Sequence, residues 1–278
     1  MNILLPVSRG ASFGDAVQLA IDTAKAHAGR IRVLDVVDEA EIRRIKTGAR
    51  PGAMHLAQHA ADEVQKRMTA EGIAVVAETV RRCEEAGVPV RGDVLEGELK
   101  REFESASGAN DLLVSAVGSH FAPDLEDASG QVVLKVMREG GMPVLLSSTP
   151  YRPVRTVVVG CGGGLRTERA VGAMARLSLW KDATRRILFA VDDTAEGGRA
   201  RIAAPSKILA DAGYPPCEET IYLGPHPRSK SFLFFCDKVD ADVVVLGGWG
   251  EHRWNDLLGT SITGRLLGDG RRHLFLYM

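Results

Sequence analysis

The chain has 278 residues, of which 45% are hydrophobic and 26% charged, so it has enough apolar material for buried cores and no region whose composition requires disorder. Lysine plus arginine number 35 and aspartate plus glutamate 36, a balance that predicts no attraction to nucleic acid or to an anionic membrane surface. The four cysteines are far apart without a CxxC pair, and no apolar run approaches the length of a membrane span, so reduced thiols and a cytoplasmic location are expected.

Short apolar runs alternate with longer amphipathic ones, a pattern typical of a parallel sheet covered by helices. The expected strands are residues 2–7, 31–37, 88–95, 111–117 and 142–147 in the first half, then 155–160, 185–191, 217–223, 241–247 and 272–277 in the second. Helices are expected at 13–28 and 165–179, each after the first strand of its half. The second crossover is long in the first half, 54–87, and is either one helix or two helices broken near Gly72; in the second half it shrinks to 199–213. The basic run at 42–52 is expected to be a solvated loop.

The two halves match each other with an offset of 131 residues. This offset pairs Ala116 with Gly247 and Ser119 with Gly250, and it pairs Ser129 and Gly130 with Thr260 and Ser261. Duplication of one α/β unit is therefore the working hypothesis. It predicts one domain at 1–149 and another at 154–278, each with a sheet of its own, joined by a proline-bearing linker.

Near the end of the chain, an apolar strand leads into the glycine-rich stretch "VVVLGGWGEHRWNDLLGTSITGRLL", residues 243–267. Glycine lets backbone N–H groups approach a ligand closely, and the start of a helix adds unpaired N–H groups and partial positive charge. This combination of residues predicts a phosphate site.

Three segments resemble the universal stress protein family in its tandem two-domain form: "ILLPVSRG" at the first strand, "GELKREFESASGANDLLVSAVGS" before and through the fourth, and the closing glycine-rich stretch. The resemblance implies an adenine nucleotide alpha-hydrolase-like fold, with two parallel five-stranded sheets of order 3-2-1-4-5 and helices on both faces. It also implies that the last strands of the two domains meet and that ligands bind beyond the carboxyl ends of the strands.

The closing stretch is similar to the family's nucleotide motif, G-x2-G-x9-G-[ST]. Gly247 and Gly250 match its first two glycines, but the third position holds Thr260, with Ser261 after it and Gly259 one residue early. Either Gly259 and Thr260 form the functional pair, or Thr260 and Ser261 keep the register; the second is preferred because the first half has the same spacing. Thr263 lies two residues beyond and completes the predicted phosphate site. In the first half most of the motif is replaced, so no nucleotide is expected there.

Family members that bind ATP have an aspartate facing the adenine at the end of the first strand. Ser8 stands there in the first half, and Cys161, with its neighbour Gly162, in the second. Cys161 is therefore a candidate ligand-facing residue, at a helix start that would stabilise a thiolate. The glycines around it lack the spacing of a dinucleotide loop and are expected to allow close backbone packing.

These observations leave two hypotheses for function. One is a stress-responsive sensor that binds ATP or another adenine nucleotide in the second domain; the other is an adaptor that acts through an unknown protein partner. An enzyme is disfavoured, with slow ATP hydrolysis as its upper limit, because no residue is placed to activate water. His55 and His59 have zinc spacing but lack a third ligand, so no metal is expected. Self-association through the last strands is expected inside the chain, and a homodimer is left open.

Overall fold

The computed structural model describes residues 1–8, 10–47, 54–97, 101–102, 105–106, 108–116, 141–224, 228–247 and 262–277. The first half contains β1 (Asn2–Pro6), α1 (Phe13–Ala26), β2 (Arg30–Asp38), α2 (Glu39–Thr47), α3 (Met54–Glu85), β3 (Val90–Gly97), β4 (Leu112–Ala116) and β5 (Val144–Ser147). The second contains β6 (Thr156–Gly160), α6 (Leu165–Arg176), β7 (Arg185–Asp192), α7 (Ala195–Asp211), β8 (Glu218–Leu223), α8 (Arg228–Lys238), β9 (Val243–Gly247), α10 (Ile262–Asp269) and β10 (His273–Tyr277). All ten expected strands are present.

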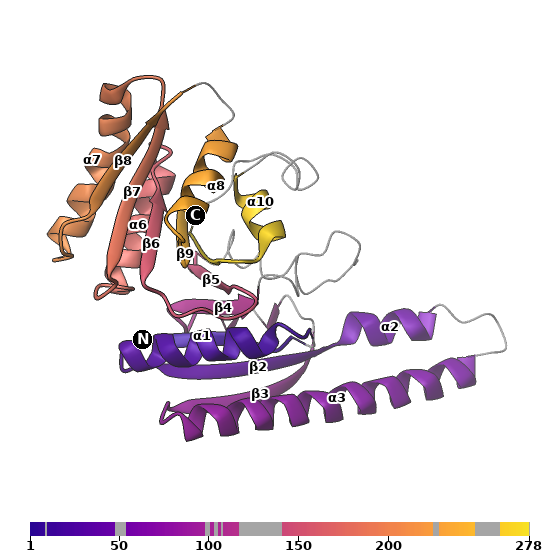
Figure 1. Cartoon of the computed structure of the whole chain (residues 1–278). Coiled ribbons are helices and arrows are strands. Elements are labelled where there is room, and N and C mark those ends of the chain that lie inside the picture. Colours follow the sequence, from indigo (N-terminus) through magenta and orange to yellow (C-terminus); the bar gives the residue numbers. More distant parts are fainter. Residues whose placement is uncertain are drawn as a thin grey trace.

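The sheet has the order β3-β2-β1-β4-β5-β10-β9-β6-β7-β8. Each half therefore has the order 3-2-1-4-5 with parallel pairing, as the resemblance implies. The last strands meet, because β10 pairs antiparallel with β5 and sets Phe275 beside Leu145. Hydrogen bonding thus runs through one ten-stranded sheet, and the expectation that each half keeps a separate sheet is not met. Figure 1 shows the first half at the bottom of the view and the second above it.

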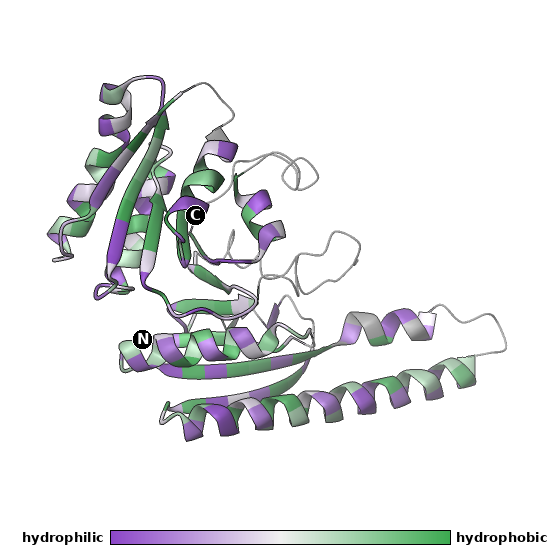
Figure 2. Ribbon diagram, in the orientation of Figure 1, coloured by the Kyte–Doolittle hydropathy of each residue, from purple (hydrophilic) through white to green (hydrophobic). Residues whose placement is uncertain are grey.

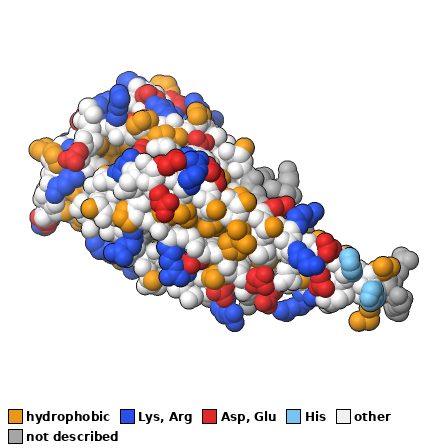
Figure 3. Space-filling view, turned by 90° about the horizontal axis from the view of Figure 1, so that it is seen from below, with side chains coloured by type: hydrophobic (Ala, Val, Ile, Leu, Met, Phe, Trp, Pro, Cys, Tyr) orange, Lys and Arg blue, Asp and Glu red, His pale blue; other side chains and the backbone are white. Residues whose placement is uncertain are grey.

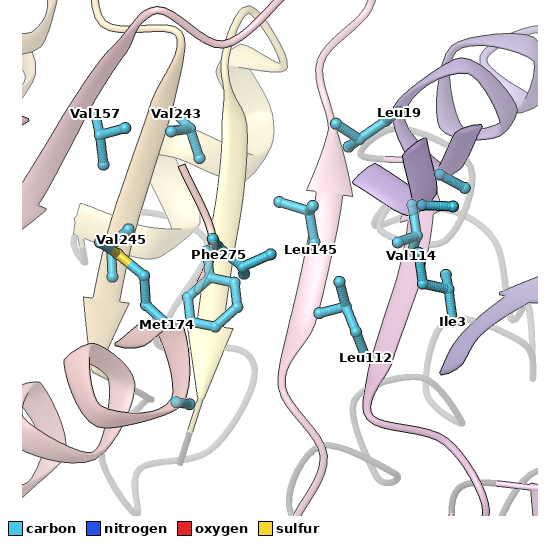
Figure 4. Close-up of a cluster of buried hydrophobic side chains, with 14 of the residues drawn as sticks. Ile3, Leu19, Leu112, Val114, Leu145, Val157, Met174, Val243, Val245 and Phe275 are labelled. Carbon is cyan, nitrogen blue, oxygen red and sulfur yellow. The ribbon is translucent and has the colours of Figure 1, made fainter. Parts of the chain in front are cut away.

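Helices cover both faces of the sheet. One face carries a core to which α1, α3, α6 and α7 contribute, and the other carries a core with residues from α8 and α10. The strands are mainly hydrophobic, and the helices carry hydrophilic residues on their outer sides (Figure 2). The four residues of β5 are all buried, as expected for a strand packed on both faces. Figure 4 shows Leu145 and Phe275 on neighbouring strands in one cluster, so the core continues across the junction of the two halves.

The long crossover of the first half is one helix of 32 residues, α3, and Gly72 lies inside it. A Cβ at Gly72 would come within 2.0 Å of Asp35 Oδ2, so the glycine allows α3 to lie against β2 instead of breaking the helix. The prediction of a solvated loop at 42–52 is wrong for residues up to Thr47, which belong to α2. Ile42 is 6% exposed, and α2 packs along α3. Among the described residues, no helix has both the length and the apolar character needed to cross a membrane.

Candidate functional site

A pocket of about 190 Å³ lies at the carboxyl ends of β6, β7 and β9 in the second half. Its lining comes from these strands, from the turn after β6, and from helices α6, α7, α8 and α10. The lining residues are Gly160, Cys161, Gly162, Thr167, Phe189, Val191, Arg201, Phe232, Leu246, Gly247, Ile262 and Thr263. Parallel α/β sheets bind ligands at this edge, so the pocket is the candidate site.

One wall of the pocket is apolar. The ring centroids of Phe189 and Phe232 are 5.5 Å apart in an edge-to-face arrangement, and the two side chains are 1% and 3% exposed. A Cβ at Gly160 would come within 2.6 Å of Leu246 Cδ2. The glycine therefore permits the close packing that the sequence predicted for this turn, and it keeps β6 from filling the pocket with a side chain of its own.

Gly247, the first glycine of the predicted motif, ends β9 against the first turn of α6. A Cβ there would lie 2.4 Å from Arg166 C, 2.5 Å from Arg166 O and 2.6 Å from Thr167 N. These are backbone atoms that cannot rotate away, so no side chain fits. The structure thus gives Gly247 a packing function, which brings the start of α6 beside the pocket.

The turn from β6 into α6 requires glycine for its backbone conformation. Gly163 and Gly164 both have φ of +83°, in the region that residues with a Cβ rarely adopt. The turn leaves the N-cap of α6 without a side-chain hydrogen bond. Within the turn the Gly162 N–H donates to the Gly160 carbonyl at 3.2 Å, and Arg201 of α7 lies beside Gly163.

Cys161 lies in this turn, in the pocket lining. Its backbone N–H donates to the Phe189 carbonyl at 2.8 Å, and its side chain is 3% exposed. Burial raises the pKa of the Cys161 thiol to about 12, because an apolar environment disfavours the charged form. The expectation of a stabilised thiolate at this helix start is therefore wrong, and the thiol is neutral near neutral pH.

Arg201 is the charged side chain among the described lining residues, and no motif in the sequence predicts it there. Its Nε donates to Asp192 Oδ2 at 2.6 Å, and its Nη1 donates to the carbonyl of Gly162. The pKa of Asp192 is lowered, chiefly by its hydrogen bond to Arg201. Asp192 also accepts the Thr194 N–H at 3.1 Å. The ion pair holds the guanidinium beside the glycine turn and balances its positive charge with the carboxylate of Asp192.

Three of the predicted site residues come together in this pocket: Cys161, Gly247 and Thr263, the last from the first turn of α10. Four others, Gly250, Gly259, Thr260 and Ser261, lie outside the described residues.

In the first half, Ala116 is buried at the end of β4, and Ser8 Oγ accepts the Gly10 N–H at 3.3 Å. Ser119, Ser129 and Gly130 lie outside the described residues. His55 and His59 are exposed on α3, as expected for surface histidines. Within the described ranges, no group of three or more His, Cys, Asp or Glu side chains could hold a metal ion.

No family model matches the sequence, and no curated protein matches it by sequence. Solved structures do match. A universal stress protein from Archaeoglobus fulgidus has 17% identity and a TM-score of 0.72, with 99% of this chain and 95% of that chain covered. A functionally unknown protein from Pseudomonas aeruginosa has 15% identity and a TM-score of 0.55, with 99% and 92% covered. The likeness extends over both halves. The chain therefore has the universal stress protein fold, in its tandem two-domain form.

Proposed function

We propose that this chain is a stress-response binding protein of the universal stress protein type, and that its second half senses an adenine nucleotide such as ATP. The observation that supports this proposal is the pocket beyond β6, β7 and β9, which combines an apolar wall, a fixed guanidinium and the first turn of α10. A cytoplasmic location, domains at 1–149 and 154–278, and signalling to a protein partner are parts of the same proposal.

The apolar end of the pocket suits the base of a nucleotide, and the end at α10 suits its phosphate groups. Phe189, Val191 and Phe232 offer an apolar surface on which a base can be buried, and burial of apolar area drives such binding. Ile262 and Thr263 belong to the start of α10, where unpaired N–H groups and the helix dipole favour a phosphate. The predicted residues Gly250, Thr260 and Ser261 lie just before this helix in the sequence and are proposed to complete the phosphate site.

A second function, that of an adaptor without a nucleotide, is favoured by the base end of the pocket. Adenine donates hydrogen bonds from its amino group, so its recognition calls for an acceptor. Cys161 supplies a neutral, buried thiol instead of a carboxylate, and the carbonyl of Gly162 already accepts from Arg201. Neither hypothesis requires catalysis. No described lining residue is a carboxylate or imidazole that could activate water, so any ATP hydrolysis is expected to be slow.

Native mass spectrometry of the full chain purified without added nucleotide, followed by calorimetric titration with ATP, tests the proposal. Binding of one ATP per chain is expected. Ser261→Ala and Thr263→Val are expected to weaken it about fivefold or more, since each removes a hydroxyl donor. Ser129→Ala, at the position paired with Thr260 in the first half, is the matched control and is expected to bind like the wild type.

The outcomes separate the hypotheses. If no nucleotide co-purifies and titration with ATP produces no heat, the nucleotide proposal fails and the adaptor function remains. If ATP binds but Ser129→Ala weakens binding and Ser261→Ala does not, the site is in the first half. Release of inorganic phosphate well above the rate in buffer would contradict the expectation that the chain is not an efficient enzyme.

A further inference from the structure

The edge of the sheet beside β3 is open, because β3 stands first in the strand order and its only described neighbour is β2. The Ile31 N–H donates to the Pro89 carbonyl at 2.9 Å. Since backbone groups alternate along a strand, the odd-numbered residues of β3 direct their N–H and C=O groups toward β2. The even-numbered residues of β3, exposed Gly92 among them, therefore direct theirs to the open edge. A further strand can pair there.

A groove of about 650 Å³ runs beside this edge, between β3 and α3. Ile73, Ala77 and Val80 line it from the helix, and Gly92 and Val94 line it from the strand. Ile73 is 55% exposed although it is a large hydrophobic residue. Figure 3, which views the molecule from the side of α3 and β3, shows hydrophobic side chains gathered among charged ones on this face. An added strand would cover apolar surface as well as satisfy backbone groups.

The charges on β3 make it complementary to a second copy of itself. In an antiparallel pair centred on Gly92, Arg91 of each copy lies opposite Asp93 of the other. Moving the centre to Arg91 or to Asp93 would set like charges opposite each other, which is destabilising. Within the chain, Asp93 already pairs with Arg32 at 2.8 Å and with Arg91 at 2.9 Å, and the Arg91 side chain is 75% exposed. The guanidinium of Arg91 is therefore free to turn from its own Asp93 to that of the second copy.

The same register satisfies the backbone. With Gly92 at the centre, even-numbered residues face even-numbered residues, and these are the ones whose N–H and C=O groups point to the open edge. Arg91 and Asp93 then form the non-hydrogen-bonded pairs, in which opposing side chains are closest. The opposite edge strand, β8, has Glu218 and Glu219 and no cationic residue. The β8 edge therefore lacks the charge complementarity that β3 has with a second copy of itself.

The helices also fit this arrangement. Because α3 packs on both β2 and β3, it lies over the space between them. Across a two-fold axis at Gly92, the two α3 helices would be two strand widths apart, about 9.6 Å, which is within the roughly 8–10 Å of packed helices. They would run antiparallel, so their N-terminal halves would extend in opposite directions without meeting. Ile73, Ala77 and Val80 have the i, i+4, i+7 spacing of one helix face and would fill the contact.

We propose that two copies of this chain form a symmetric dimer through the β3 edges, with antiparallel pairing centred on Gly92 and packing of α3 on α3. This interface is separate from the pocket of the second half, so it does not depend on the proposed function.

Sedimentation velocity of the full chain over a wide concentration range tests the proposal, and a dimer is expected. Ile73→Glu places a charge in the apolar contact, and Arg91→Asp sets like charges opposite each other. Each is expected to raise the dissociation constant of the dimer at least about tenfold. Both residues are exposed, so circular dichroism and the melting temperature should show an intact fold. Tyr222→Glu, at a partly exposed site on the β8 edge, is the matched control and should leave the dimer unchanged.

Cysteine cross-linking adds a geometric test. Ala77→Cys lies near the proposed axis, so oxidised glutathione should produce a disulfide-linked dimer. Lys66→Cys lies on the same side of α3 but 11 residues away, which puts it about 33 Å from its own copy in an antiparallel pair, and it should not cross-link. A wild-type chain that stays monomeric throughout overturns the proposal. So does a dimer that withstands both Ile73→Glu and Arg91→Asp, or equal cross-linking of the two cysteine variants.

Discussion

Asp111 and Asp242 make equivalent hydrogen bonds between the fourth and the first strands of their halves. Asp111 accepts the backbone N–H of Asn2, at the start of β1, at 2.7 Å. Asp242 accepts the backbone N–H of Thr156, at the start of β6, at 2.9 Å. Each aspartate comes directly before the fourth strand of its half, and the two positions are 131 residues apart, which is the offset of the sequence match. The two halves therefore share this individual hydrogen bond as well as the order of their strands.

The two aspartates should differ in their contribution to stability. Asp242 is 6% exposed, also accepts the Arg155 N–H at 2.9 Å, and lies 3.0 Å from Arg152 Nη2, whereas the hydrogen bond of Asp111 is exposed. Asp242→Ala is expected to lower the free energy of unfolding by about 3 kcal/mol, because it leaves buried donors without a partner, and Asp111→Ala by about 1 kcal/mol or less. Urea unfolding measures both. Equal losses of unfolding free energy in the two variants would contradict the conclusion that Asp242 contributes more because it is buried.

His273, the first residue of β10, hydrogen-bonds to the segment between β5 and β6 and is fully buried. Its Nδ1 accepts the backbone N–H of Ser148 at 2.9 Å, and its Nε2 lies 2.6 Å from the carbonyl of Arg152, so Nε2 is the nitrogen that bears hydrogen. Burial lowers the pKa of His273. Its hydrogen bond to Arg152 and the charges of Asp242 and Asp15 oppose this shift in part. The imidazole of His273 is therefore neutral in the folded chain, and in this form it makes both hydrogen bonds.

This geometry predicts a loss of stability in mild acid. The unfolded chain binds a proton at His273 as the pH falls through about 6.5, while the folded chain, with its lowered pKa, does so only at lower pH. His273 therefore makes its full contribution to the free energy of unfolding above about pH 6.5, and this contribution decreases below that pH. Urea unfolding from neutral pH to about pH 5 should show a shallower decrease for His273→Gln than for the wild type. His59→Gln, at an exposed site on α3, should keep the wild-type slope.

Gly247 and Gly172 should respond in opposite ways to alanine. A Cβ at Gly247 meets backbone atoms of α6 at 2.4–2.6 Å, whereas one at Gly172, inside α6, meets nothing within 4 Å. Gly247→Ala is expected to cost about 3 kcal/mol through overpacking, and Gly172→Ala to stabilise by about 0.5–1 kcal/mol through helix propensity. Thermal unfolding compares them. A stable Gly247→Ala variant that has lost only nucleotide binding would contradict the packing function.

The strands could be predicted from the sequence because each is a short apolar run bounded by turn residues, as in "TVVVG" of β6. Their order came from the family resemblance. The α2 segment was missed because its charges dominate the pattern, and Ile42 is the one apolar residue that the structure shows to be buried there among those described. Its burial depends on α3, which follows in the sequence, and local composition does not contain that contact.

The candidate site could be predicted only in part. Gly247 opens the recognisable motif and Thr263 lies two residues beyond its end, so the sequence could place both near one site, and both line the pocket. Arg201 comes from α7 and reaches the pocket through its ion pair with Asp192, nine residues earlier. An acidic residue at a strand end followed by an arginine in the next helix could have suggested the pair. No pattern indicates that Nη1 would then bond to Gly162, because that contact depends on how α7 packs beside the turn.

Cys161 should be chemically inert in the folded protein. With its thiol pKa raised to about 12 by burial, the thiolate fraction at pH 8 is about one in ten thousand. Cys83 and Cys236 are also buried, and Cys217 is partly exposed. Burial raises the pKa of the Cys217 thiol as well, but its exposure should make it the cysteine that a disulfide reagent labels first at about pH 8. Cys217→Ser should abolish the fast reaction, and urea should make the other three thiols reactive. Rapid labelling of Cys161 in the native chain, located by peptide mass spectrometry, would show that the pocket opens to solvent and would contradict the inertness of this thiol.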